Sequence, residues 1–309
     1  MRTRTLGSGG PELSVIGYGA WEAGGADWGP NESDEAVIAA MRAALDAGID
    51  WIDTAEVYGN GVSEGLVGRA VAGRRDEVTI ATKVAPASEG SGFRPEQVRA
   101  ACDGSLGRLG IDHIDLYQLH WPDETGVNVE DTWGAMCELQ DAGKVLNIGV
   151  SNFDRERIER CEAIRHVDSL QQEFSLLVRD DAKLIAWCGD QGTGVVTYSP
   201  LAAGLLTGAI SHETAFAAGD WRSERGDEGL FSPEALGRNL TVVDGLRSIA
   251  EGLGVSVSQL ALAWNIAQPG VTSAIAGSRN PQHVRSNAAA GDLELDAQTL
   301  AAVDALVES

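Results

Sequence analysis

Apolar runs of strand length alternate with amphipathic segments of helix length along almost the whole chain. This alternation is typical of repeated strand–helix units that build a parallel sheet. Between the runs lie helix-like segments such as Arg94–Leu109 and Ser33–Ala47, in which Ser33 is the expected N-cap and Glu35 lies in the first turn. The predicted strands are Val15–Gly19, Ile49–Asp53, Val78–Lys83, Ile114–His120, Val145–Ser151, Ser169–Gln171, Gly194–Tyr198 and Thr272–Ala276.

The number and spacing of these units predict a closed barrel. Eight strand–helix units in 309 residues match an α/β fold of the (β/α)8 (TIM barrel) type, formed by residues 1–309 as one domain. An open doubly wound sheet is the alternative. The early loop Gly17–Glu22 lacks the G-x-G-x-x-G spacing of a dinucleotide-binding fingerprint, which disfavours that alternative.

Two segments depart from the strand–helix rhythm. Met1–Pro11 predicts an N-terminal β-hairpin that turns at Gly7–Gly10 and covers the bottom of the barrel. Ser211–Arg238 predicts a long irregular connection at the C-terminal face, and long loops in compact domains are usually functional lids or disordered.

The most unusual feature of the composition is its excess of acidic residues. Apolar residues make up 43% of the chain, which is enough for a large core. Acidic residues number 46 against 23 lysines and arginines, a formal charge of −23. Such a surface repels nucleic acid and anionic membranes, so neither is an expected partner. A phosphate-bearing ligand would therefore need cations placed locally.

Cysteine spacing and apolar run lengths indicate the compartment. No cysteine pair shows a CxxC spacing and no histidine lies at metal-ligand spacing to a cysteine, so reduced thiols and no metal site are predicted. The first residues lack the apolar run of a signal peptide, and no apolar run approaches about 18 residues. We therefore expect a cytoplasmic protein without a membrane span. The four cysteines are Cys102, Cys137, Cys161 and Cys188.

Polar side chains gather where the predicted strands end. In a barrel of this type the reactive groups lie at the C-terminal ends of the strands. Each residue alone has an ordinary structural explanation, such as a cap or a hydrogen-bonded core histidine. Folding does not require ionisable or polar groups at the same end of successive strands. They are Asp53, Lys83, His120, Ser151, Asn152, Gln171 and Tyr198, and the last strand runs into Gly277, Ser278 and Arg279.

Lys83 is the most informative of these residues. It is one of only three lysines and follows an apolar strand directly, so a buried ammonium that pairs with Asp53 is expected. Tyr58 lies five residues after Asp53, and a nearby ammonium would favour its phenolate and lower its pKa from about 10. An alternative remains open: Lys83 itself attacks a carbonyl and forms a Schiff base.

Five short motifs, in this order, resemble those of the aldo-keto reductases, and the resemblance covers essentially the whole chain. It implies an NAD(P)H-dependent oxidoreductase that reduces an aldehyde or ketone, sugars included, to the alcohol without a metal. NADPH is the expected cofactor, with NADH as the alternative. The motifs are Asp53–Gly59 (DTAEVYG), Ala81–Lys83 (ATK), Leu119–Pro122 (LHWP), Gly149–Phe153 (GVSNF) and Tyr198–Leu201 (YSPL).

The resemblance also implies roles for individual residues. Tyr58 would be the general acid, Lys83 and Asp53 would tune it, and His120 would orient the substrate carbonyl. Four residues would hold the nicotinamide, three through its carboxamide and Tyr198 by stacking on the ring. The carboxamide residues are Ser151, Asn152 and Gln171.

For the rest of the cofactor, the resemblance points to the segments after the last two strands. A guanidinium suits bidentate phosphate binding, so Arg279 together with Ser278 would take the 2′-phosphate of NADPH. His283 stands where many relatives carry Gln or Arg. The pyrophosphate would lie along Leu201, Gly204, Leu205 and Thr207, and the adenosine end along Gly277, Ser278, Arg279, His283 and Asn287.

A substrate pocket is predicted from aromatic side chains, although such residues at barrel loops also serve simple packing. They identify no particular carbonyl compound. The predicted pocket residues are Trp21, Trp28, Trp121 and Trp221, with Phe216 and Arg222 from the irregular connection.

A non-catalytic, cofactor-binding regulatory subunit on the same fold is the second functional hypothesis, because fold does not fix function.

Overall fold

The computed structural model describes residues 1–217, 219–224 and 229–307. Within them, eight parallel strands close into a barrel in the order β3 to β10, with β10 paired back to β3. Each predicted strand is present, and its ends move by at most two residues. The barrel strands are β3 (Ile16–Gly19), β4 (Trp51–Asp53), β5 (Thr79–Val84), β6 (Ile114–Leu119), β7 (Val145–Ser151), β8 (Ser169–Glu173), β9 (Gly194–Tyr198) and β10 (Val271–Ile275).

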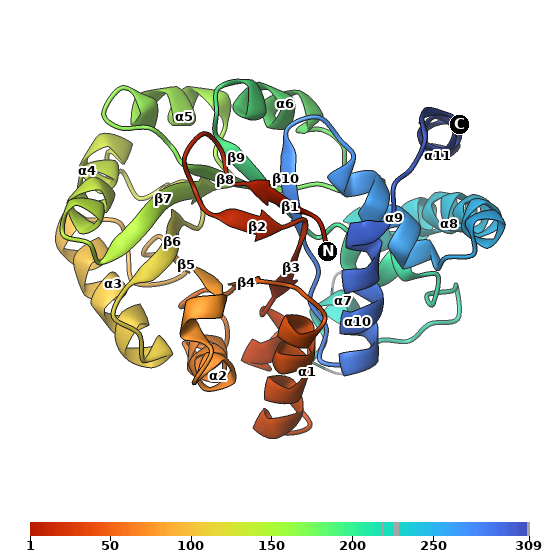
Figure 1. The fold of residues 1–309 in the computed structure, drawn as a ribbon, viewed down its shortest axis with the longest axis horizontal. Helices are drawn as coiled ribbons and strands as arrows, with labels where there is room; N and C mark the ends of the chain where they lie inside the picture. Colours follow the sequence, from red (N-terminus) through yellow and green to blue (C-terminus); the bar gives the residue numbers. More distant parts are fainter. Residues whose placement is uncertain (218, 225–228, 308–309) are drawn as a thin grey trace.

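The helices surround the barrel (Figure 1). Ser33 caps the first of them, because its Oγ accepts a hydrogen bond from the backbone N–H of Ala36 at 3.1 Å. None of the helices in the described ranges is long and apolar enough to cross a membrane. The α-helices are α1 (Asp34–Asp46), α2 (Val62–Val71), α3 (Pro95–Leu109), α4 (Val129–Asp141), α5 (Arg155–Glu162), α6 (Ala182–Asp190), α7 (Trp221–Glu224), α8 (Pro233–Leu253), α9 (Val257–Ile266), α10 (Pro281–Ala289) and α11 (Ala297–Val307).

The N-terminal hairpin closes the bottom of the barrel, as predicted. Strands β1 (Thr3–Thr5) and β2 (Glu12–Ser14) pair in antiparallel register, and they cross the centre of the barrel in Figure 1. Leu6 and Leu13 are fully buried against the barrel interior. The hairpin extends beyond the predicted end at Pro11, because the residues of Leu6–Pro11 form the turn and the second strand must follow it.

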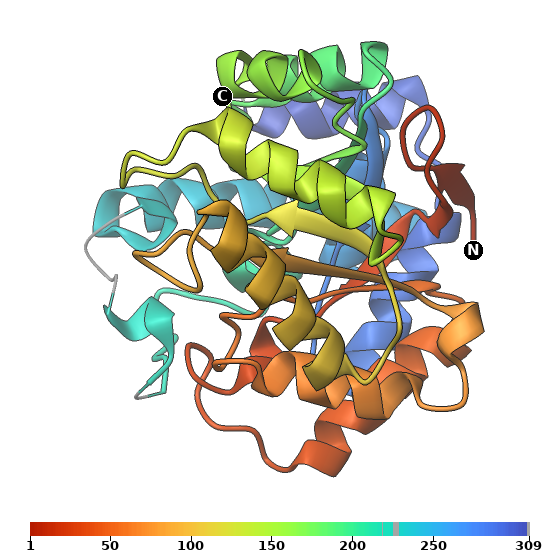
Figure 2. The ribbon, with the colours of Figure 1, turned by 90° about the vertical axis from the view of Figure 1, so that its left-hand side faces the viewer.

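The long connections lie at the C-terminal face of the barrel. Figure 2 shows α7, which belongs to one of them, at the end of the molecule opposite the N-terminal hairpin. The predicted irregular segment Ser211–Arg238 ends earlier than expected, at the start of α8. Pro233 fits the first turn of a helix, and the Oγ of Ser232 accepts from the N–H of Ala235 at 3.3 Å. Residues 218 and 225–228 of this segment lie outside the described residues. Short 3-10 helices span Glu22–Gly24, Arg75–Glu77, Ala202–Thr207, Gly229–Phe231 and Ala290–Asp292.

Candidate active site

A buried lysine lies at the centre of the barrel mouth. Lys83 on β5 is fully buried, and its Nζ donates to Asp53 Oδ1 at 2.6 Å and to the carbonyl of Thr54 at 2.8 Å. The hydroxyl of Tyr58 lies 3.3 Å from the same nitrogen. Strands β4 and β5 are neighbours in parallel register, so their C-terminal ends bring these side chains together.

The Asp53 carboxylate is held from two sides. Its second oxygen accepts a hydrogen bond from Nε2 of Gln171 at 2.8 Å, across the barrel from β8. A buried ion pair loses the solvation of both charges, and this loss is offset only where further hydrogen bonds satisfy the remaining oxygens and protons. Gln171 and Thr54 provide those bonds to Asp53 and Lys83 respectively, so the arrangement is fixed.

The pKa of Tyr58 lies well above its ordinary value, because burial and the charge of Asp53 both disfavour the phenolate. The expectation that this pKa is lowered is therefore wrong for the structure described here, because the effect of the Lys83 ammonium is outweighed. Asp53 lies against the same ammonium and offsets its positive charge, and burial adds to the effect. Burial also lowers the pKa of Lys83, against the opposing pull of Asp53. Tyr58 is consequently a neutral phenol at neutral pH.

His120 borders Tyr58. It follows β6 directly, its ring stacks on Trp121 with centroids 3.6 Å apart, and it meets the Tyr58 ring edge-on at 5.6 Å. Burial and the charge of Lys83 hold the pKa of His120 well below its ordinary value, so the imidazole is neutral. Its Nδ1 is buried and has no hydrogen-bond partner in the described part of the chain.

The residues predicted to hold the nicotinamide are connected to one another. Asn152 adopts a left-handed backbone (φ 62°), which asparagine tolerates better than most residues. Its Nδ2 donates to the carbonyl of His120 at 3.0 Å and to Ser151 Oγ at 3.1 Å. The hydroxyl of Tyr198 donates to Asn152 Oδ1 at 2.8 Å and thereby fixes the orientation of its ring.

The segment after β9 has an unusual backbone. Ser199, Ala202 and Ala203 are non-glycine residues with positive φ of 52°, 49° and 53°. Residues held in sparsely populated conformations tend to cluster at ligand sites. The predicted pyrophosphate residues Leu201, Gly204, Leu205 and Thr207 follow or surround them. Leu205 is fully buried and its side chain packs in the core, whereas Thr207 Oγ1 donates to the carbonyl of Gly204 at 2.6 Å.

The segment after β10 contacts β3 closely. A Cβ on Gly277 would lie 2.2 Å from the carbonyl oxygen of Gly19, so only glycine fits there. The hydroxyl of Tyr18 donates to the carbonyl of Ser278 at 2.9 Å. These two contacts set the direction in which the chain leaves the barrel and enters α10.

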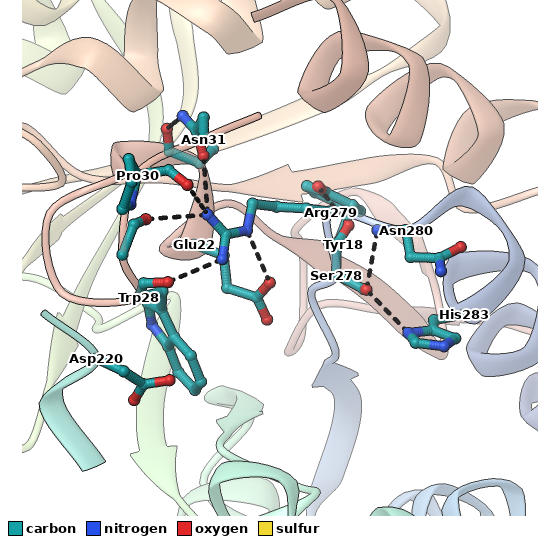
Figure 3. Close-up of polar contacts among 12 residues, drawn as sticks. Tyr18, Glu22, Trp28, Pro30, Asn31, Asp220, Ser278, Arg279, Asn280 and His283 are labelled. Carbon is teal, nitrogen blue, oxygen red and sulfur yellow. Dashed lines mark hydrogen bonds and ion pairs between the residues drawn. The ribbon is translucent and has the colours of Figure 1, made fainter. Parts of the chain in front are cut away.

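The predicted adenosine-end residues lie at different depths. Ser278 Oγ is exposed, 3.5 Å from Nδ1 of His283, and it accepts from the backbone N–H of Asn280 at 3.1 Å (Figure 3). Asn287 is buried, with 5% of its surface exposed. Arg279 does not point into open solvent: its guanidinium donates to backbone carbonyls of the connection between β3 and α1.

Three of the four predicted pocket tryptophans form one cluster. Trp21 meets Trp28 edge-on at 5.3 Å and stacks on Trp221 at 6.1 Å, and its ring lies 6.3 Å from that of Tyr58. Trp121 lies apart from them, against His120. The cluster therefore forms one wall beside Tyr58.

Two predicted pocket residues from the irregular connection, Phe216 and Arg222, extend this wall. The Arg222 guanidinium lies 4.7 Å above the Trp28 ring and 4.4 Å above that of Phe216. It also pairs with Asp220 at 2.6 Å. The wall thus continues into the connection that precedes α8.

Gln118 is a buried polar residue near the barrel mouth that the sequence analysis did not predict as part of the site. Gln118 on β6 stands opposite Lys83 in the strand register and is fully buried. Neither atom of its amide has a hydrogen-bond partner among residues 1–217, 219–224 and 229–307. The signal was present in the sequence, because a single glutamine interrupts the otherwise apolar end of the strand Ile114–Leu119.

Comparison with known proteins identifies the family of this barrel. The profile of the Aldo/keto reductase family matches residues 15–308. This chain belongs to that family. The aldo-keto reductase YhdN of Bacillus subtilis (strain 168) is 37% identical over 289 residues, which cover 91% of this chain and 86% of YhdN. Probable aldo-keto reductase 1 of Glycine max is 33% identical, with 96% of this chain and 86% of that protein covered.

Solved structures agree with this assignment. The glycerol dehydrogenase AKR11B4 of Gluconobacter oxydans superposes with a TM-score of 0.88 at 31% identity, covering 99% of this chain and 94% of that one. The aldo/keto reductase of Klebsiella pneumoniae, solved with NADP and acetate, gives a TM-score of 0.76 at 30% identity, covering 99% and 96%. Aldo-keto reductases are oxidoreductases that act on carbonyl compounds with nicotinamide cofactors.

Proposed function

We propose that this aldo-keto reductase reduces a small aldehyde or ketone to the alcohol, with Tyr58 as the proton donor and NADPH as the preferred cofactor. NADH is the alternative cofactor. One observation carries the proposal: the hydroxyl of Tyr58 lies 3.3 Å from the buried Nζ of Lys83, which Asp53 holds in place. When bound, the reduced nicotinamide supplies the hydride.

The residues at the barrel mouth fit such a cofactor. Amide and hydroxyl groups that both donate and accept hydrogen bonds suit a carboxamide, and an aromatic ring held by its own hydroxyl suits a flat heterocycle. Tyr198 is that ring, fixed by Asn152. We propose that Ser151, Asn152, Gln171 and Tyr198 hold the nicotinamide, that Leu201, Gly204, Leu205 and Thr207 border the pyrophosphate, and that Gly277, Ser278, Arg279, His283 and Asn287 border the adenosine end.

The protonation states support Tyr58 as the acid. Its raised pKa keeps the phenol protonated at neutral pH, which a general acid requires. When the phenol gives its proton to the carbonyl oxygen, the resulting phenolate lies beside the ammonium of Lys83 and is stabilised by it. The neutral imidazole of His120 packs edge-on with the same ring and would provide a second hydrogen-bonding group for that oxygen.

The burial of Lys83 argues against the Schiff-base alternative. Its Nζ is fully buried and contacts three oxygens, so an attacking amine would first have to break the pair with Asp53. The regulatory-subunit alternative requires no complete set of proton-transfer residues. Asp53, Tyr58, Lys83 and His120 all lie at one point of the barrel mouth, and this arrangement favours an enzyme.

Replacing the phenol by phenyl tests the proposal. Tyr58→Phe should lower kcat/KM for carbonyl reduction by about 10²–10⁴, the usual contribution of a general acid, and should leave NADPH affinity within about twofold. The measurement is NADPH oxidation with a panel of aldehydes, ketones and sugars, beside a fluorescence titration of cofactor binding.

The chain offers a matched control. Tyr117→Phe removes a buried hydroxyl that has no hydrogen-bond partner in the described ranges, so turnover should stay close to wild type. Near-normal turnover by Tyr58→Phe would contradict the assignment of the acid. Cofactor binding by the wild type without turnover on the whole panel would favour the regulatory subunit.

A further inference from the structure

The Arg279 guanidinium is surrounded by oxygen atoms of the connection between β3 and α1 (Figure 3). Its Nη2 donates to the carbonyl of Trp28 at 2.8 Å. Its Nη1 lies 3.0 Å and 3.1 Å from the carbonyls of Gly29 and Pro30, and 3.3 Å from the side-chain oxygen of Asn31. Four consecutive residues thus share one guanidinium that lies about 250 positions away in the sequence.

A carboxylate neutralises part of this charge. Glu22 Oε2 lies 3.7 Å from Arg279 Nε, and burial raises the pKa of Glu22 while Arg279 opposes that rise. Together, the carbonyls and the carboxylate surround the guanidinium with acceptors of the kind that a phosphate would offer. Arg279 therefore has structural partners of its own within the chain.

The segment that Arg279 holds forms part of the aromatic wall. Trp28 pairs through its backbone with Asp220, and the N–H of Trp221 donates to the carbonyl of Asp27 at 2.8 Å. The Trp28 ring contacts Trp21 and Trp221 edge-on, at 5.3 and 5.9 Å. Trp21 in turn lies beside Tyr58. A continuous series of contacts therefore leads from Arg279 to the wall beside the proposed acid.

We propose that Arg279 is a positioning residue for the substrate pocket: by holding the backbone of residues 28–31, it fixes the tryptophan wall beside Tyr58. The substrate part of this inference rests on the proposed function, whereas the holding of the loop does not. Arg279 acts on the carbonyl substrate through Trp28, in addition to any contact with a cofactor phosphate.

Hydrogen exchange in the cofactor-free protein tests the holding of the loop. Hydrogen bonds to a charged group are stronger than neutral ones, and Arg279→Ala removes several at once. It should therefore speed amide exchange in peptides covering residues 22–31 by about tenfold or more. Peptides from α3 should exchange as in the wild type. Arg279→Lys keeps the charge and loses the planar fork, and it should speed exchange in the same peptides. Unchanged exchange in residues 22–31 of both variants would overturn the proposal.

Steady-state kinetics at saturating cofactor test the effect on the pocket. Arg279→Ala should raise the KM for the carbonyl compound by roughly fivefold or more, with kcat within about twofold, because a displaced wall weakens substrate positioning. A residue that only binds the cofactor phosphate would change cofactor affinity and leave this KM unchanged, and that result would overturn the positioning role.

A control on α10, the helix that follows Arg279, separates local from general effects. Arg285 lies on α10, and its Nη1 contacts only the carbonyl of Pro281 in the hydrogen bonds of the described chain, at 3.4 Å. Arg285→Ala should leave both exchange and KM at wild-type values. If the wild type shows no turnover at all, the proposed function fails, and the exchange experiment still decides whether Arg279 holds the loop.

Discussion

The two ends of the proposed cofactor cleft are built in different ways. At the reaction end, charged and polar side chains are buried and bond to one another: Lys83 to Asp53, and Asp53 to Gln171. At the adenosine end, Asn287 is buried, but Ser278 and Arg279 are half-buried and His283 is exposed. The principal cation there, Arg279, bonds to loop carbonyls.

This difference predicts how much stability is lost when a polar partner is removed at each end. A buried ion pair is costly to break, because removal of one partner leaves an uncompensated charge away from water. An exposed polar group loses little when its partner is removed, because water replaces that partner. The reaction end should therefore respond to substitution through folding as well as chemistry, whereas the exposed residues of the adenosine end should respond mainly through affinity.

The largest effect is expected for Lys83→Met, which keeps the length of the side chain and removes the ammonium. Asp53 then remains buried with its charge unpaired, and the free energy of unfolding should fall by about 3–5 kcal/mol. Urea denaturation measures this loss. Lys144→Met is the control: its pair with Asp103 is exposed, so the loss should be under about 1 kcal/mol. Equal losses in the two variants would remove the contrast between buried and exposed charges.

A smaller effect is expected at the junction between the two ends. Gly277→Ala places a Cβ 2.2 Å from the backbone oxygen of Gly19, which cannot move without disturbing β3. The strain should lower the free energy of unfolding by about 1–3 kcal/mol. Gly107→Ala in α3 meets no atom within 4 Å and should stabilise the protein by about 0.5–1 kcal/mol. Thermal and urea unfolding of the pair provide the comparison, and a neutral Gly277→Ala would show that the close contact is tolerated.

The pH dependence of stability should distinguish the buried imidazole from exposed ones. Because burial lowers the pKa of His120 in the folded protein, the unfolded chain takes up a proton there more readily as pH falls below about 6.5. Stability should therefore decrease from pH 7 to pH 5, and His120→Asn should reduce that slope. His212→Asn changes an exposed histidine and should keep the wild-type slope. Parallel curves for all three proteins would argue against a buried neutral His120.

The smallest effect on stability is expected for Ser278→Ala at the exposed end. Its hydroxyl accepts a hydrogen bond from the N–H of Asn280, and this bond is exposed to solvent. Water can replace the hydroxyl as acceptor, so the free energy of unfolding should change by under about 0.5 kcal/mol. Affinity for NADPH should fall severalfold, while affinity for NADH stays the same. Fluorescence titration with both cofactors measures this. Equal weakening of both would show that Ser278 does not face the 2′-phosphate.

Much of the fold could be predicted because one pattern repeats. Apolar runs separated by helix-like segments define eight strands, and the ends of those strands in the structure stay within two residues of the prediction. Segments without such repetition were predicted less well. The hairpin extends past Pro11, and α8 begins before the predicted end of the irregular connection, since both boundaries depend on local pairing and capping.

The sequence by itself determined the barrel and the gathering of Asp53, Lys83 and His120 at one face. Parallel strands in a closed barrel must end at the same edge, so position along the strand is enough to place a side chain there. Only the tertiary structure decided the protonation of Tyr58 and the partners of Arg279. The pKa of Tyr58 depends on the balance between burial and opposite neighbouring charges, which spacing does not reveal. The partners of Arg279 are backbone carbonyls, which every residue carries, so no side-chain pattern marks them.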